Sequence, residues 1–229
     1  MKKKKVLFVL TSCNTIGDSV KATGWWLSEA SHPWKVLSMT GYEVDFVSPK
    51  GGEAPRTGED AKDMINKEFL ESNDICRKIK NTLLPDEVNI ENYVAIHFVG
   101  GHGAMLDLPE NESLAKLTAK FWEQGKIVSA ISHGVAGLLN VKLKGNEYLV
   151  KGRNLTSYTD MEEKAGNTVD MIPYYLQCEL MLKGAIFHIS KVWGDNVQVH
   201  ERLITGQNPM SGLSLGKALA AMLEHLKLG

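Results

Sequence analysis

The fold of this chain is constrained most by a series of short apolar runs that lack the polar alternation of half-exposed strands. The runs are residues 6–10, 44–47, 94–99 and 127–131. Such runs predict strands that are buried on both faces, which is typical of parallel sheets.

Helical patterns separate these runs, and they are placed at 24–37, 113–122 and 213–228. Strands that alternate with helices predict a doubly wound, mainly parallel α/β sheet of the flavodoxin-like kind, with helices on both faces. At 229 residues the chain has the length of one large domain, so we expect a single domain over 1–229. The polar stretch at about 51–92 is interpreted as an insertion with short helices.

Composition removes several classes of function. A net charge of −1 disfavours nucleic-acid binding, and no run approaches the ~20 apolar residues that a membrane span needs. The cysteines, Cys13, Cys76 and Cys178, have no metal-ligand spacing and are odd in number. They favour a reducing, cytoplasmic location.

Two motifs follow strands at the edge where doubly wound sheets bind ligands. Gly100-Gly101-His102-Gly103 follows the third run, and its backbone N–H groups suit an oxyanion hole, although glycine-rich turns are common without one. Ser132-His133-Gly134 follows the fourth run and has the pattern of a nucleophile elbow. The alternative for Ser132 is an ordinary helix cap.

Several ordered motifs resemble the DJ-1/PfpI superfamily, in the branch of the glyoxalase III enzymes and the thirty-one-kilodalton heat-shock chaperones. Residues 130–134 are similar to its Ala-x-Cys-His-Gly elbow, with serine at the cysteine position. The likeness extends to 5–12, 23–33, 41–48, 100–103, 152–163 and a C-terminal signature at 203–209.

The resemblance implies a role for each site residue. Ser132 would be the nucleophile and His133 its base, oriented by Glu163 or by the adjacent Glu162. Glu29 would lie against the nucleophile as a carboxylic acid or proton shuttle. The resemblance and the glycine motifs assign Gly101, His102, Gly103 and Gly134 to the pocket and oxyanion hole. We expect neither a cofactor nor a metal. Cys13 is not expected to replace the elbow nucleophile.

Serine at the elbow changes the chemistry. With water's pKa of about 15.7 as a stand-in for an alcohol, a drop of ~5 units leaves roughly one oxyanion in several thousand at pH 7. A thiol ionises much more readily. Serine marks either a naturally divergent member or an engineered replacement of cysteine, and the sequence leaves both open.

The leading functional hypothesis is a glutathione-independent glyoxalase that converts a 2-oxoaldehyde such as methylglyoxal to a 2-hydroxy acid, impaired here by Ser132. A related activity is removal of early glycation adducts from proteins. The alternatives are a holdase chaperone for unfolded proteins and an amidase or peptidase. The family also implies a homodimer, with apolar surface from the Trp-rich first helix at 24–37 and from the 51–92 insertion.

Two geometric expectations follow. Ser132 should adopt a strained backbone with unfavourable or positive φ. The Glu29 carboxyl should lie within hydrogen-bonding reach of the Ser132 hydroxyl, with a raised pKa caused by apolar neighbours.

Overall fold

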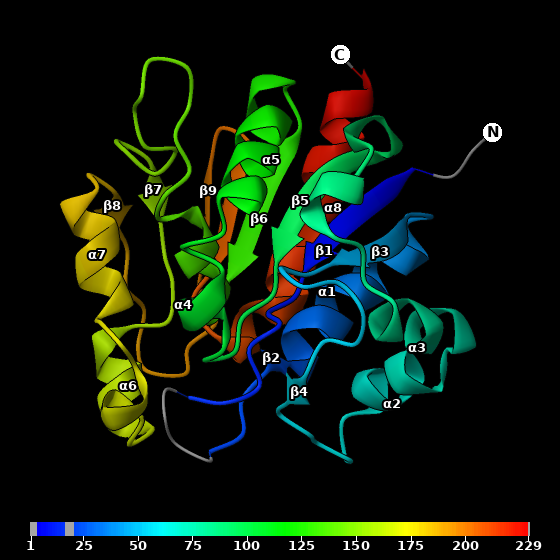
Figure 1. Cartoon of the computed structure of the whole chain (residues 1–229), viewed down its shortest axis with the longest axis horizontal. Coiled ribbons are helices and arrows are strands. Elements are labelled where there is room, and N and C mark those ends of the chain that lie inside the picture. The colour runs from blue at the N-terminus through cyan, green and yellow to red at the C-terminus, as the bar shows by residue number, and fades with distance from the viewer. Residues whose placement is uncertain (1–3, 17–20, 229) are drawn as a thin grey trace.

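A six-stranded sheet forms the centre of the computed structural model, which describes residues 4–16 and 21–228 (Figure 1). The strand order is β3-β1-β5-β6-β10-β9. The strands are β1 (Lys5–Val9), β3 (Glu43–Val47), β5 (Tyr93–Phe98), β6 (Ile127–Ile131), β9 (Val197–His200) and β10 (Leu203–Gly206). All neighbouring pairs are parallel except β9 and β10. The predicted fold class, doubly wound and mainly parallel, is confirmed.

The four predicted strands agree with β1, β3, β5 and β6 to within one residue at each end. The two strands at the far edge were not predicted. β9 (VQVH) has a polar residue at every second position and is largely half-exposed, and β10 (LITG) has only two apolar residues before Thr205, so neither presents the apolar run that marked the others.

Helices cover both faces of the sheet. α1 (Leu27–Met39) and α8 (Gly212–Leu228) pack on each other and on one face. α5 (Glu112–Glu123) and the short α4 (Ala104–Asp107) cover the other, and Figure 1 shows α5 in front of the sheet. In the described part of the chain, no helix has the length and apolarity needed to cross a membrane.

The start of the first helix differs from the prediction. Trp25–Trp26 forms a short strand, β2, parallel to β4 (Arg56–Thr57), and the helix begins only at Leu27. The Trp25 backbone N–H donates to Pro55 O at 2.9 Å, and its indole is completely buried. Trp25 therefore offers no surface to a partner, so the apolar surface expected from this segment cannot come from Trp25.

The segment 51–92 contains the expected short helices, α2 (Met64–Glu71) and α3 (Asn73–Lys80), and two 3-10 turns, η1 (Pro85–Glu87) and η2 (Ile90–Asn92). Asp63 caps α2 by accepting hydrogen bonds from two backbone N–H groups of its first turn. Because α2 packs on α1, the insertion lies close to the helix that carries Glu29.

The remaining elements lie between β6 and the C-terminal helix. They are η3 (Ser132–Leu138), β7 (Asn154–Leu155), α6 (Asp160–Ala165), η4 (Val169–Met171), α7 (Leu176–Leu182), β8 (Ile186–Phe187) and η5 (Pro209–Ser211). α6 and α7 lie together at the left of the view in Figure 1, beyond the β9 edge.

Candidate active site

Ser132 occupies a strained turn at the end of β6. Its φ is +55°, and only 2% of the residue is exposed. This region of φ is unfavourable for a residue with a Cβ atom, so the predicted elbow is confirmed. The alternative of a helix cap is wrong, because Ser132 is the first residue of a 3-10 helix whose cap position is Ile131 and which has no side-chain cap. Gly134 permits the turn, since a Cβ there would lie 2.5 Å from the Phe98 carbonyl oxygen.

Glu29 lies in the first turn of α1 and is 1% exposed. Burial raises the pKa of its carboxyl to about 8, although hydrogen bonding with the Ser132 side chain and the Gly100 backbone opposes this rise. The Glu29 carboxyl and the Ser132 side chain thus lie close together, and a hydrogen bond between them at about 2.6–3.2 Å stays a prediction. Gly100 leaves room for the carboxyl, because a Cβ at that position would lie 2.2 Å from Glu29 Oε2. This oxygen is buried and has no partner in good hydrogen-bond geometry.

His133 connects the elbow to α6. Its Nε2 lies 2.6 Å from Glu163 Oε1, and its Nδ1 lies 3.5 Å from Ser132 Oγ. The carboxylate can only accept, so Nε2 carries the proton and Nδ1 presents a lone pair toward the serine. Burial, together with the nearby His102, lowers the pKa of His133. The ring is therefore neutral at neutral pH and can act as a base.

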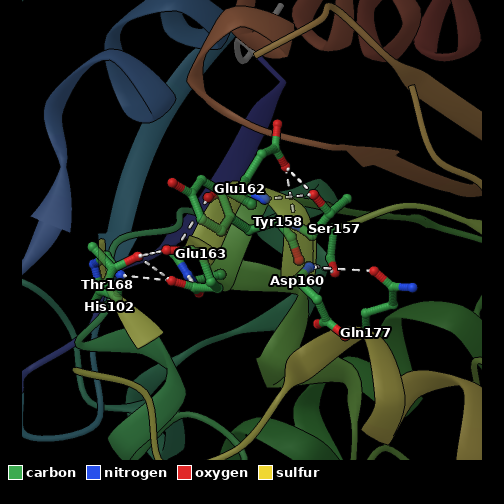
Figure 2. A network of polar contacts seen from close by, with 11 residues as sticks. His102, Ser157, Tyr158, Asp160, Glu162, Glu163, Thr168 and Gln177 are labelled. Atoms are coloured by element: carbon green, nitrogen blue, oxygen red, sulfur yellow. Dashed lines mark hydrogen bonds and ion pairs between the residues drawn. The ribbon is translucent and has the colours of Figure 1, made fainter. Parts of the chain in front are cut away.

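Glu163, and not Glu162, is the carboxylate against His133. Figure 2 shows Glu163 directed toward His102 and Thr168, and the distance from Glu163 Oε2 to His102 Nε2 is 3.5 Å. Burial alone would raise the pKa of Glu163, but the nearby His102 and the hydrogen bonds with His133 and Thr168 hold it at about 2. Glu163 is therefore ionised.

The adjacent Glu162 organises the C-terminal signature instead. Its carboxylate accepts five hydrogen bonds of 2.7–3.0 Å, from Thr159 N and Oγ1, Trp193 N, Gln207 Nε2 and Asn208 Nδ2. The sequence identified 203–209 as a signature without giving it a task. Two of its polar side chains hold Glu162, which fixes the α6 turn that also carries Glu163.

A cavity of about 470 Å³ opens beside the elbow and is lined by Ser132, His133, Glu29, Gly101 and His102, among others. Gly103 and Gly134 are not among the lining residues, since both pack inward, and their assignment to an oxyanion hole stays a prediction. A Cβ at Gly103 would contact Thr11, and one at Gly134 the β5 backbone. Cys13 also lies outside the lining.

The sequence did not single out Tyr158 or Trp193, which also line the cavity. The Tyr158 ring lies 4.3 Å from the His133 ring between centroids and 5.6 Å from that of Trp193. Tyr158 directly precedes Thr159, the cap of α6, and this position was the only feature of the sequence that could have indicated a place for Tyr158 near the site.

His102, His133 and Glu163 are also the residues that a metal would use in the described part of the chain. Their ligand atoms all lie within 4.8 Å of one another. Two histidines and one carboxylate suit zinc. However, a metal bound here would replace the hydrogen bond between His133 Nε2 and Glu163, which fixes the tautomer of His133. The arrangement can therefore transfer protons only when no metal is bound.

Taken together, the geometry provides a hydroxyl on a strained turn, a neutral carboxylic acid beside it and a neutral imidazole held by a carboxylate. The sequence matches the DJ-1/PfpI family over residues 20–222. The chain belongs to this family. Glutathione-independent glyoxalase HSP31 of Saccharomyces cerevisiae is 31% identical, with 93% of this chain and 95% of the relative covered.

Two solved structures support the same grouping. Rapid Encystment Protein 24 kDa of Francisella tularensis has a TM-score of 0.91 and 34% identity, over 95% of this chain and 98% of that one. Glyoxalase III of Candida albicans has a TM-score of 0.84 and 26% identity, over 95% and 96% of the two chains. The predicted family and branch are therefore confirmed.

Proposed function

We propose that this protein is a glutathione-independent glyoxalase, which converts a 2-oxoaldehyde such as methylglyoxal and one water to the 2-hydroxy acid. The observation that carries the proposal is the buried Glu29 carboxyl, with a pKa of about 8, against the elbow residue Ser132. A carboxylic acid that stays protonated at neutral pH can donate a proton and take one back during the same reaction. The names of the relatives support the same chemistry.

The reaction begins with addition to the aldehyde. Ser132 Oγ bonds to the aldehyde carbon, its proton passes to His133 Nδ1, and Glu29 protonates the carbonyl oxygen. The product is a hemiacetal, with Glu29 now ionised and His133 charged. The ionised Glu163 at 2.6 Å from His133 Nε2 stabilises that charge.

Proton transfers then move the oxidation level between the two carbons. Glu29 removes the hydrogen of the former aldehyde carbon while His133 protonates the ketone oxygen, which gives an enediol. His133 takes the proton of the first hydroxyl, and Glu29 delivers its proton to the second carbon. One carbon is oxidised and its neighbour reduced, so no external oxidant is consumed. Water hydrolyses the resulting ester, and a proton passes from His133 to Glu29, which regenerates the starting forms.

Ser132 is the weak part of this scheme. Its Oγ lies 3.5 Å from His133 Nδ1, which is longer than the ~2.6–3.2 Å of an effective general-base contact. A thiolate would not need this base, because it is already deprotonated. We therefore expect slow turnover by the serine protein and much faster turnover after Ser132→Cys.

The test is methylglyoxal turnover by the protein and by Ser132→Cys, with the 2-hydroxy acid measured directly. The double variant Ser132→Cys/Glu29→Gln should lose at least ~100-fold of the regained rate, the usual worth of a general acid–base group. Ser132→Cys/Glu53→Gln, which alters an exposed glutamate, is the control. The glyoxalase proposal fails if Ser132→Cys produces no hydroxy acid, and the role of Glu29 fails if the double variant turns over at the full rate.

The holdase alternative has one observation in its favour. Met181, Leu182 and Ile186 are close in sequence and 53%, 79% and 49% exposed. Exposed apolar side chains of this kind can bind unfolded clients or a second subunit, the homodimer expected from the family. Leu182→Glu should weaken client protection in an aggregation assay or dissociate a dimer seen by light scattering. If it does neither, this surface serves neither purpose.

Hydrolysis of an amide substrate by Ser132→Cys would favour the amidase alternative.

A further inference from the structure

The cavity beside Ser132 is much larger than methylglyoxal requires. Cavities of ~300–1,000 Å³ hold ligands of drug size, and this one has about 470 Å³. Methylglyoxal carries only a methyl group beyond its two carbonyls, so most of the cavity would remain filled with water. The side chains in the unused part therefore indicate what a larger substrate would carry.

The unused part is here called the distal arm, and its polar lining comes from α1 and the 51–92 segment. The lining residues are Ser28, His32, Glu59, Asp60, Asp63 and Asn66. His32 lies three residues after Glu29 on the same helix, about 4.5 Å farther along its axis. Positions three apart share a helix face, so the arm begins one turn from the reacting carbonyl.

The carboxylates of the distal arm already have partners in the protein. Asp63 Oδ2 lies 2.6 Å from His32 Nε2, and Glu59 pairs with Arg56 at 2.7 Å. Asp60 Oδ1 accepts from the Lys62 backbone N–H at 2.9 Å. Because each carboxylate already has a hydrogen-bonding partner in the protein, a ligand does not have to be cationic to bind in the arm. Each carboxylate can still accept further hydrogen bonds.

Asn66 supplies the observation that points to a ligand. It is 1% exposed, and its Oδ1 accepts from Ser31 Oγ at 2.5 Å. Its Nδ2 is buried without a hydrogen-bond partner, although Asn66 lines the cavity. A buried donor without a partner destabilises the protein, and an acceptor on a bound ligand would remove that cost.

We propose that the distal arm is a subsite for the hydroxylated chain of a sugar-derived 2-oxoaldehyde. Hydroxyl groups both donate and accept, so they match acceptor carboxylates and the Asn66 donor together. Trp26 and Trp193 also line the cavity and offer apolar faces to the carbon chain. The subsite rests on the proposed glyoxalase function, and its product would be a polyhydroxylated 2-hydroxy acid formed by the same addition of one water.

The test compares 3-deoxyglucosone with methylglyoxal. In Ser132→Cys, kcat/KM should be at least tenfold higher for 3-deoxyglucosone. Asn66→Ala in that background should lower this ratio about tenfold, as expected for one hydrogen bond of about 1.4 kcal/mol. Ser28→Leu fills the arm and should lower the ratio even if Asn66→Ala folds poorly. Asn73→Ala, on α3 and outside the lining, is the control that should leave it unchanged.

The outcomes separate the subsite from the function. A ratio near one, or a ratio that neither variant lowers, overturns the subsite while the glyoxalase function stands. If Ser132→Cys turns over neither aldehyde, the function fails. In that case, calorimetry measures the binding of 3-deoxyglucosone to the unaltered protein and to Ser28→Leu. Weaker binding by Ser28→Leu would support the subsite, and equal binding would overturn it. Preference for an arginine–methylglyoxal adduct would show that the arm selects a cation and would overturn the proposal.

Discussion

The buried acid at the elbow can be tested without any turnover, through the pH dependence of stability. Burial raises the pKa of Glu29 from 4.5 to about 8. A carboxyl with a raised pKa binds more protons in the folded state, so its effect is absent below pH 4.5, and stability is lost as pH rises from there toward 8. At 1.36 kcal/mol for each pKa unit, this shift amounts to about 5 kcal/mol in total, of which about 3–4 kcal/mol falls between pH 5 and 8.

Glu29→Gln keeps the shape of the side chain and removes the titration. The free energy of unfolding of the variant should therefore fall less than that of the unaltered protein between pH 5 and 8, by about 3–4 kcal/mol. Urea denaturation at several pH values in this range measures the free energy of unfolding of both proteins. A constant offset between the two proteins does not matter, because the comparison uses the difference in slope.

Glu53→Gln is the matched control, since it makes the same chemical change at an exposed position. Its stability should follow that of the unaltered protein across the range. Parallel curves for Glu29→Gln and the unaltered protein would mean that Glu29 ionises normally in the fold. The reasoning that makes it a neutral acid at pH 7 would then be refuted.

Three further substitutions test the geometry of the site. Ser132→Gly should raise the free energy of unfolding by about 1 kcal/mol in thermal melts, because glycine tolerates the φ of +55°; a loss would mean that side-chain contacts outweigh the strain. Gly100→Ala should displace Glu29 and reduce methylglyoxal turnover in the Ser132→Cys background, and unchanged turnover would exclude this contact from the mechanism. Glu162→Gln should cost about 1.5–3 kcal/mol in urea denaturation, because five donors lose a charged acceptor, and a neutral effect would show that they find water instead.

Local sequence pattern predicted much of this fold because the central strands are buried on both faces. A strand in that position must be apolar throughout, and β1, β5 and β6 are visible for this reason. β9 and β10 were not predicted because they are strands through their pairing at the edge of the sheet, and their own composition does not indicate it. The start of α1 was predicted too early for a similar reason, since the Trp25 backbone N–H donates a hydrogen bond to the distant Pro55 carbonyl and Trp25 belongs to a short strand.

The elbow at Ser132 was also predictable, because an apolar strand that ends abruptly at a small polar residue and a glycine is a local signal. The assignment of Glu163 was not. Glu162 and Glu163 are adjacent and chemically identical, and only the direction of each side chain from α6 separates them. One meets His133, and the other meets Gln207 from the C-terminal signature.

The sequence by itself determined the fold class, the elbow and the types of group that surround it, since these depend on burial patterns and short-range turns. Only the tertiary structure decided how those groups act. The protonated state of Glu29 depends on complete burial between α1 and the Gly100 turn, and the reach of the distal arm depends on α2 packing against α1. Both are contacts between segments far apart in the chain, and a pKa or a cavity arises from such contacts and not from the order of residues.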